Sequence, residues 1–300
     1  MKRIIVAILF LTMISSISFA QTWKRYRKEY VYSIGATNLL ADLGGANQIG
    51  THFVKDLDIR STRIFGGFGY RYRIDRHQSI RGNVYLGFLY GNDNLTLEPA
   101  RQYRNLIVRT QIAELSGQYE YFVNKDKDGH RYNIKHAHGS KNIHLHTYAF
   151  AGAGVLFYNP QGPYPGGGWV SLKPLGTEGQ NVPNSGIKQY NRITAMFPVG
   201  IGTKYAITKH LSLGLEVSVR YTLTNYLEDV GGLYYDKKAI IAAGGPDGGT
   251  AGYFSDPSNG ANPGWTTTGE VRGKKNKDTY MYMNLTLNQR IAPKRTKAKF

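Results

Sequence analysis

The chain has 300 residues, a formal net charge of +18 and no cysteine. Without cysteine, the chain can have no disulfide framework, no thiolate metal site and no lipid-modified cysteine of a lipoprotein. The 36 glycines and 23 tyrosines fit one large β domain, because glycine suits turns and narrow barrel interiors and tyrosine suits membrane interfaces. The positive charge predicts an anionic partner, which can be a lipid surface, an acidic protein or a nucleic acid.

Residues 1–20 have the composition of a cleaved signal peptide. A basic start, Met1-Lys2-Arg3, precedes an apolar stretch from Ile4 to Ile14, and Ser18-Phe19-Ala20 offers the small residues that signal peptidase needs. The apolar stretch is too short to span a bilayer, and no other run approaches the roughly 20 apolar residues of a membrane helix. We therefore expect an exported mature chain that begins at Gln21, and export disfavours a nucleic-acid partner.

Eight segments of the mature chain alternate apolar with polar or small residues, which is the period of a β-strand whose faces meet different surroundings. In chain order they span residues 30–38, 62–75, 79–91, 111–123, 143–159, 190–207, 211–225 and 279–291. Long loops follow the odd-numbered segments, including residues 226–278, which show almost no apolar period. Mostly short turns follow the even-numbered segments. The pattern predicts a single all-β domain over residues 21–300, an eight-stranded antiparallel transmembrane β-barrel with long extracellular loops and both termini in the periplasm.

The segment 211–225 indicates which face of the strands looks outward. Its odd positions, from Leu211 to Leu223, are apolar, whereas the even positions include small polar residues, Glu216 and Arg220. A soluble ligand-carrying barrel would place the apolar face inside. Small polar residues suit a narrow lumen better than a solvated surface, which is usually rich in lysine and glutamate. We therefore expect the apolar face to contact outer-membrane lipid and the lumen to be filled by side chains, without a solute channel.

Charged residues on the inward faces form the first candidate site. They are Glu114, Glu120, Glu216, Arg63, Arg71, Arg81 and Arg220. A lumenal ion-pair network of these residues would neutralise buried charges, because an unpaired buried charge is strongly destabilising. A path for protons or a solute is the alternative interpretation.

Histidines form the second candidate site, since five of the eight lie between His130 and His146. The weak candidates for zinc or copper ligands are His136, His138, His144 and His146. No carboxylate or thiolate at a fixed spacing completes a coordination sphere, so the sequence predicts no metal site. The run from Asn124 to Gly129 resembles half a calcium loop, but Lys135 stands where a bidentate glutamate is required.

Catalytic and nucleotide-binding motifs are missing from the sequence. Gly152-Ala-Gly154 lacks the third glycine of a dinucleotide loop, and no Gly-x-Ser-x-Gly motif occurs. We therefore expect a non-enzymatic protein without a cofactor. A lipid-modifying barrel enzyme with a serine and histidine pair stays an open alternative, because such sites are defined by geometry and not by order in the sequence.

Several segments, in order over nearly the whole mature chain, look like the PorG-like outer-membrane β-barrel family. They are Ala41-Asp-Leu-Gly-Gly45, Arg104-Asn-Leu106, Ala113-Glu-Leu-Ser116, Ala151-Gly-Ala-Gly-Val-Leu-Phe-Tyr-Asn-Pro160, Pro174-Leu-Gly-Thr-Glu-Gly-Gln180 and Tyr221-Thr-Leu-Thr-Asn-Tyr-Leu-Glu-Asp-Val230. The resemblance implies a barrel component of the type IX secretion system, associated with the periplasmic ring of the PorK-like lipoprotein and the PorN-like protein. It also implies a link to gliding motility in gliding species, and it carries over no catalytic residue.

The turn at residues 124–142 is the candidate partner-binding segment, because it is the one long turn on a side where the others are tight. Its candidate residues are Lys125, Asp126, Lys127, Asp128, His130, Arg131 and Lys135. Their net positive charge predicts an acidic patch on the ring proteins and an association that weakens with salt. Outer-membrane lipid and lipopolysaccharide are the other expected partners. A surface-exposed binding or adhesion barrel is the alternative function.

Overall fold

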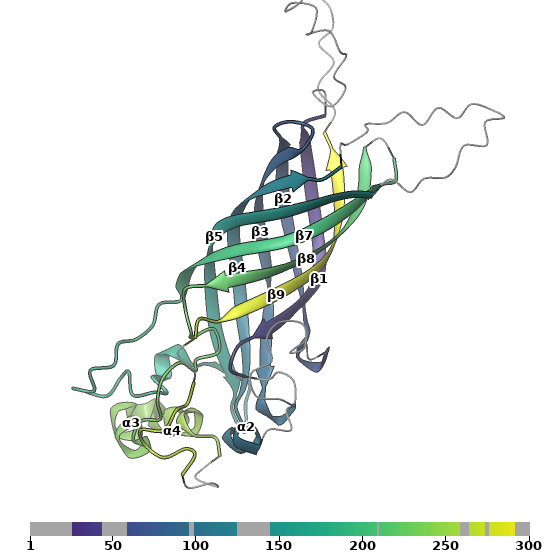
Figure 1. The fold of residues 1–300 in the computed structure, drawn as a ribbon. Helices are drawn as coiled ribbons and strands as arrows, with labels where there is room; N and C mark the ends of the chain where they lie inside the picture. Colours follow the sequence, from purple (N-terminus) through teal and green to yellow (C-terminus); the bar gives the residue numbers. More distant parts are fainter. Residues whose placement is uncertain are drawn as a thin grey trace, which may run out of the picture.

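Eight long antiparallel strands close into a barrel in the computed structural model of this protein (Figure 1). The structure describes residues 26–43, 59–95, 99–124, 145–208, 210–258, 264–273 and 276–291. The barrel strands are β1 (Lys28–Leu40), β2 (Arg63–Arg73), β3 (Gln78–Asn92), β4 (Ile107–Phe122), β5 (Leu145–Pro163), β7 (Ile193–Ala206), β8 (Leu211–Thr222) and β9 (Thr279–Arg290). A short strand, β6 (Trp169–Ser171), extends the sheet beside the end of β5.

The pairing of the last strand with the first closes the sheet. Neighbours follow the order β1, β2, β3, β4, β5, β7, β8, β9, and the closing ladder runs from Glu29 opposite Arg290 to Leu40 opposite Thr279. A closed ladder leaves no unpaired edge in lipid. The predicted eight-stranded antiparallel barrel is therefore confirmed. The observed strand ends differ from the predicted ones mainly on the loop side. There, β4 begins four residues before the predicted residue 111, and β5 ends four residues after the predicted residue 159.

Apolar side chains face outward along the whole barrel. Ile64 is 73% exposed and Ile201 is 63% exposed, whereas Glu216 and Arg220 are each only 2% exposed. This arrangement confirms the predicted orientation and excludes the soluble barrel with an apolar lumen. An outward apolar belt on a closed barrel is the surface that hydrocarbon requires, so the protein is an integral outer-membrane barrel.

The lumen has two layers of different polarity. The layer nearer the chain termini holds the charged side chains, whereas the layer nearer the loops is apolar and aromatic. Its residues are Leu39, Phe65, Tyr85, Leu89, Ile112, Leu156, Tyr158, Tyr190, Met196, Leu227, Tyr280 and Tyr282. The prediction of a polar inward face is thus correct only for the charged layer nearer the chain termini. The loop residue Leu227 enters the second layer, so these strand ends pack against the loops as a soluble protein core does.

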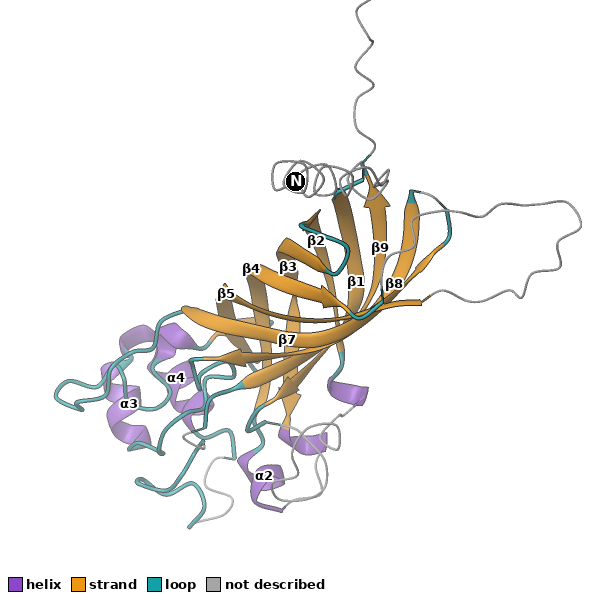
Figure 2. Cartoon of the chain, turned by 45° about the horizontal axis from the view of Figure 1, so that its top comes forward, coloured by secondary structure: helices purple, strands orange, loops and turns teal. Residues whose placement is uncertain are grey.

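The loops opposite the chain termini form an ordered structure, which we call the cap: the described residues of 41–62, 93–106, 164–192 and 223–278. Figure 2 shows its helices gathered at one end of the barrel. They are η3 (Ile59–Ser61), η4 (Asp93–Leu95), α2 (Pro99–Arg104), η5 (Lys173–Leu175), α3 (Lys237–Ala243), η6 (Gly245–Asp247) and α4 (Gly248–Ser255). No helix in the described ranges is long and apolar enough to cross a membrane.

The cap has an apolar core of its own. The core residues are Leu43, Leu106, Val108, Leu172, Leu175, Val230, Ile240, Ala251 and Phe254. They come from the four long loops that the sequence predicts after the first, third, fifth and seventh strands. The segment 226–278, in which the sequence shows almost no apolar period, is therefore folded over much of its length, because its few apolar residues pack against other loops and not along one helix face.

Candidate functional site

Arg81 and Glu216 join opposite sides of the barrel across the lumen. Arg81 donates to both carboxylate oxygens of Glu216, over 2.7 and 2.9 Å. In the closed strand order, β3 and β8 are four strands apart in either direction, so this pair spans the interior. Glu120 continues the network, since its carboxylate lies 3.0 Å from Arg81 Nε and 2.6 Å from Arg71 Nε. Tyr148 also donates its hydroxyl to Glu216.

Toward the chain termini, four cations surround one carboxylate. Glu29 lies 2.9 Å from Arg71, 3.1 Å from Arg73, and 3.3 Å from both Lys204 and Arg290. The sequence prediction did not include Glu29, Arg73, Lys204 or Arg290. The alternation of the last three already placed them on inward faces, and that signal could have identified them.

Toward the loops, Glu114 and Arg220 form the last pair of the network. The Arg220 Nε lies 3.3 Å from Glu114, which also accepts from the Tyr280 hydroxyl at 3.1 Å and the Ser116 hydroxyl at 2.9 Å. The guanidinium of Arg220 lies 3.7 Å from the ring centroid of Tyr282. The structure thus brings six of the seven predicted lumenal residues into ion pairs.

Arg63 is the exception, and its predicted place in the lumenal network is wrong. Its guanidinium lies 3.8 Å from the ring centroid of Tyr90 and donates to the backbone carbonyls of Arg60 and Thr62. Arg63 is the first residue of β2, so its long side chain can fold over the rim of the barrel, although the alternation places its Cα on the inward side.

The predicted histidine and partner sites fall mostly on residues that the structure does not describe. His136, His138 and His144 lie outside the described ranges, as do all seven partner candidates from Lys125 to Lys135. His146 is described, and it is buried on the inward face of β5. Among the described residues, no group of three histidine, cysteine, aspartate or glutamate side chains is arranged to hold a metal ion.

In the charged layer of the lumen, the ion pairs of the network link strands of the barrel to one another. Each carboxylate contacts at least one guanidinium across strands that are not sequence neighbours, and these side chains are almost fully buried. Such pairs offset the desolvation of the charges when hydrogen bonds complete them. This arrangement supports the structural interpretation of the network over a path for protons or a solute.

A second buried polar cluster holds the cap together, and the sequence analysis did not identify it. Arg272 donates to Thr177, Glu178 and the carbonyl of Asp229 over 3.2, 3.1 and 2.7 Å. Asp229 accepts from Thr177 and Tyr190, each over 2.6 Å. Asp229 has a φ of 61°, a left-handed conformation that is uncommon outside glycine, and these bonds hold it there.

Two further carboxylates tie the first loop to the others. Glu228 accepts from the backbone amides of Asp42 and Leu43 over 2.9 and 3.0 Å. Arg104 donates to both oxygens of Asp93 and to the carbonyl of Asp42. Four of the segments that resemble the PorG-like family therefore meet in the cap, although they are far apart in the sequence. They lie around residues 41–45, 104–106, 174–180 and 221–230.

Burial raises the pKa of three acids in the cap. It raises the pKa of Asp278 to about 8 and that of Asp229 to about 6, although Arg272 lowers the latter. Burial, followed by the charge of Asp278, also raises the pKa of Glu228 well above its usual range. A raised pKa means that the folded cap binds protons more tightly than the unfolded segment, in which such carboxyls titrate near pH 4.

We therefore expect the cap to lose stability as the pH rises. The contribution of these acids is fully present below about pH 4 and is lost as the pH passes through their folded pKa values, up to about 8. Hydrogen exchange of residues 225–231, corrected for the intrinsic rate, should be at least about tenfold less protected at high than at low pH. Asp278→Asn should reduce this dependence. Protection that is constant or increases with pH would contradict the prediction.

Comparisons with known proteins find only distant structural similarities. No protein-family model matches the chain, and no curated protein matches its sequence. Among solved structures, the chain is similar to Neisserial surface protein A, with 8% identity over 88% of this chain and 96% of that chain and a TM-score of 0.38. It is similar to the attachment invasion locus protein Ail of Yersinia pestis, solved in complex with the heparin analogue sucrose octasulfate, with 10% identity, 88% and 99% coverage and a TM-score of 0.36. It is also similar to the outer membrane protein OprG from Pseudomonas aeruginosa, with 8% identity, 90% and 98% coverage and a TM-score of 0.32. Similarity at this level assigns no function to the chain.

Proposed function

We propose that this protein is a non-enzymatic scaffold barrel of the type IX secretion and gliding machinery, which anchors or organises the periplasmic lipoprotein ring at the outer membrane. The proposed role as a scaffold rests on the Arg81 and Glu216 pair, which joins opposite strands across the lumen. A barrel bridged in this way has its two ends available for function, because its interior is occupied by side chains.

The assignment to the type IX secretion machinery and to its ring proteins rests on the resemblance to the PorG-like family. Four of the segments that carry the resemblance meet in the cap, through Asp42 with Glu228 and Arg104, and through Thr177 with Asp229. Their convergence supports the proposal because these segments form one structural unit. The ring contact itself is assigned to the periplasmic end, where the basic turn at 124–142 remains the candidate segment.

Replacing Lys125 to Lys141 by a short Asn-Gly turn should leave the barrel folded and reduce recovery of the ring lipoprotein after mild detergent extraction. The reason is the loss of the basic residues that would meet an acidic patch, so the wild-type association should also weaken as salt is raised. Secretion of cargo should fall in parallel. Lys238→Gln, which removes one positive charge on the exposed side of α3 in the cap, is the control at the opposite end of the barrel and should change neither readout. Normal recovery and secretion with the shortened turn would place the contact elsewhere.

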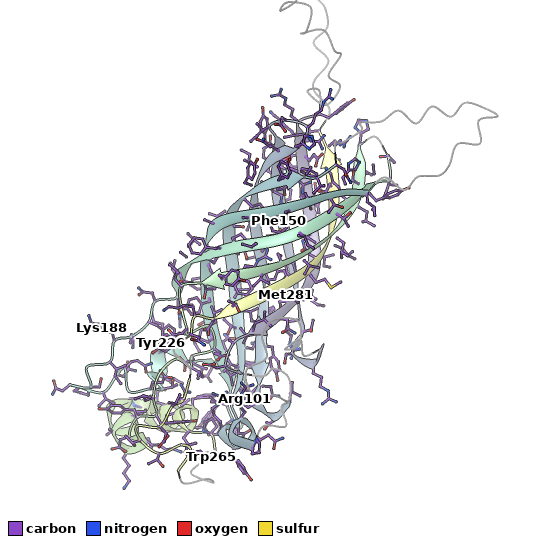
Figure 3. All side chains as sticks on the ribbon, in the orientation of Figure 1. Arg101, Phe150, Lys188, Tyr226, Trp265 and Met281 are labelled. Atoms are coloured by element: carbon purple, nitrogen blue, oxygen red, sulfur yellow. The ribbon has the colours of Figure 1, made fainter. Side chains whose placement is uncertain are left out.

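A surface-exposed binding barrel is the second candidate, and exposed aromatic residues on the cap favour it. Tyr103 and Trp265 are 46% and 45% exposed, with ring centroids 5.3 Å apart, and Trp265 lies at the outer tip of the cap (Figure 3). Leu233 and Val271 pair through an isolated β-bridge and are also exposed. Exposed apolar groups of this kind are common at contact surfaces.

The two candidates differ in which end of the barrel is sensitive to mutation. Under the binding function, Trp265→Ala with Tyr103→Ala should abolish attachment of cells to their target surface and leave the ring intact. Under the scaffold function, the same double variant should secrete cargo normally, whereas the shortened periplasmic turn should not.

A further inference from the structure

Two arginines lie on the outward side of the barrel near the cap, on strands β2 and β4, which pair with the two sides of β3. Tyr90 of β3 and Arg109 of β4 are direct partners across the ladder, and the guanidinium of Arg63 lies 3.8 Å from the Tyr90 ring centroid. Arg109 donates to Gln161 over 2.9 Å, and its guanidinium lies 4.3 Å from the ring centroid of Trp169. Both arginines thus flank one tyrosine on the membrane-facing side.

Within the described part of the chain, neither arginine is neutralised by a carboxylate. Among the described residues, no acidic side chain lies within 4.0 Å of the guanidinium nitrogens of Arg63 or Arg109. This differs from the lumen, where each buried arginine of the network contacts a glutamate. Two positive charges on either side of β3 favour an anionic group at this height of the barrel, and planar guanidinium groups match the oxygens of a phosphate.

Their height on the barrel corresponds to the lipid headgroups. On β3, Tyr90 is the next outward residue beyond Phe88, the last strongly exposed apolar residue of that strand. One outward step is about 7 Å along a strand, and the headgroup layer extends roughly 5–8 Å beyond the hydrocarbon on each side. Arg109, opposite Tyr90, therefore lies within the headgroup layer of the leaflet on the cap side.

An apolar groove runs down the outer face of the barrel directly below these arginines. It has a volume of about 720 Å³, and Arg63, Thr62 and Gln111 line its upper end. Its walls and floor include Ile64, Gly66, Leu86, Phe88, Ala113 and Phe157, from strands β2, β3, β4 and β5. Gly66, which carries no side chain, leaves room in this groove among its larger neighbours. It lies at the level of the hydrocarbon, where an acyl chain is the available occupant.

We propose that this groove and the two arginines form a binding site for a phosphorylated glycolipid of the outer leaflet, with an acyl chain in the groove and the phosphorylated headgroup against Arg63 and Arg109. A lipid of this class joins both features in one molecule. The site gives the barrel a fixed contact with the outer leaflet, independent of any periplasmic partner.

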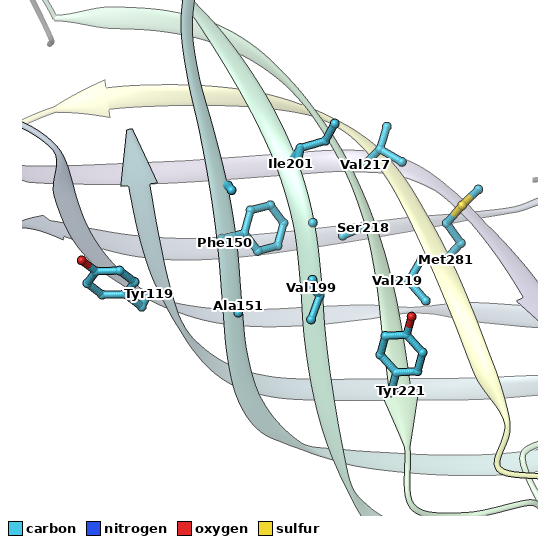
Figure 4. Close-up of a pocket in the computed structure, with 12 residues that line it drawn as sticks. Tyr119, Phe150, Ala151, Val199, Ile201, Val217, Ser218, Val219, Tyr221 and Met281 are labelled. Atoms are coloured by element: carbon cyan, nitrogen blue, oxygen red, sulfur yellow. The ribbon is translucent and has the colours of Figure 1, made fainter. Parts of the chain in front are cut away.

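A second groove on the same barrel provides the internal comparison. It has a volume of about 620 Å³ and lies on strands β4, β5, β7, β8 and β9, with Tyr119, Val199, Ile201, Val217 and Met281 around it (Figure 4). None of its lining residues is charged. An acyl chain can fill this groove, but nothing there recognises a headgroup, so we expect it to hold lipid without selectivity.

Titration of the refolded full chain with lipid A, followed by native mass spectrometry, tests the site. Wild-type protein should retain diphosphoryl lipid A in preference to phosphatidylglycerol, and inorganic phosphate alone should not bind. Arg63→Gln combined with Arg109→Gln should weaken lipid A binding by about tenfold or more, because two charge-assisted contacts are lost. Lys238→Gln, which removes one positive charge on the cap, should bind as the wild type does.

A second pair of variants tests the groove without changing charge. A Cβ at Gly66 or at Gly82 would meet no close neighbour, and both positions face lipid, but only Gly66 lines the groove. Gly66→Leu should therefore weaken lipid A binding, and Gly82→Leu should not. A shift in gel mobility on heating verifies that each variant is folded. Wild-type affinity in Gly66→Leu or in the folded double arginine variant would overturn the site, and equal affinity for phosphatidylglycerol would overturn the glycolipid assignment.

Discussion

Replacing Glu216 by alanine is expected to destabilise the folded barrel by about 3–5 kcal/mol, because the change leaves a buried arginine without its main counter-charge. Arg81 donates two hydrogen bonds to Glu216, and both side chains are at most 2% exposed. Tyr148 and Asn284 would lose an acceptor as well. The measurement is equilibrium unfolding in urea after refolding into detergent, compared between variant and wild type.

Two controls distinguish a stranded charge from a general loss of packing. Replacing both partners, Arg81→Met with Glu216→Met, should recover much of the stability, because no charge is then left unpaired at this bridge. Glu270→Ala removes an exposed acid of the cap and should change the free energy of unfolding by at most about 1 kcal/mol. A negligible effect of Glu216→Ala would refute the role of the bridge in stability.

Arg272→Ala is expected to unfold the cap and to leave the barrel intact. Arg272 is 2% exposed, and its guanidinium donates to Thr177, Glu178 and the carbonyls of Asp229 and Phe254. Its removal leaves a buried glutamate without a counter-charge, which is destabilising by about 3–5 kcal/mol. Because the cap has its own apolar core, we expect this loss to appear as local opening.

Hydrogen exchange and limited proteolysis of α3 and α4 measure this opening. In Arg272→Ala both helices should lose protection, whereas the strands should remain protected and the heated and unheated forms should still migrate differently. Arg272→Lys should have an intermediate effect, since one ammonium group cannot serve the same set of acceptors as a planar guanidinium. Unchanged protection of α3 and α4, or an equal loss across the strands, would show that Arg272 does not hold the cap.

Alternation along single strands was enough to predict the barrel and its orientation. An apolar and polar alternation along strands such as 211–225 is a local property with a period of two residues, and it places Glu216 and Leu215 on opposite faces whatever the strand pairs with. The same alternation was sufficient to put Arg71, Arg81, Glu114 and Arg220 inside. Their burial then followed from the need to keep charges out of hydrocarbon.

The pairing of the charges, in contrast, depends on contacts between distant strands. Arg81 meets Glu216 across 135 residues of sequence, and Arg290 meets Glu29 across 261 residues. Such contacts depend on the register of several ladders and on barrel closure, and alternation within one strand contains neither. Strand ends were also undetermined by alternation, which is why Arg63 was expected in the lumen although its side chain turns over the rim to Tyr90.

The cap was beyond the reach of local patterns for a related reason. Its apolar core takes one or a few residues from each of four loops, so no segment carries a periodic apolar face of its own. Its polar cluster joins Glu178, Asp229 and Arg272, which come from two different loops. The sequence determined the strands because each strand responds to its own two environments, whereas the cap and the ion-pair partners were decided by the way distant segments meet when the barrel closes.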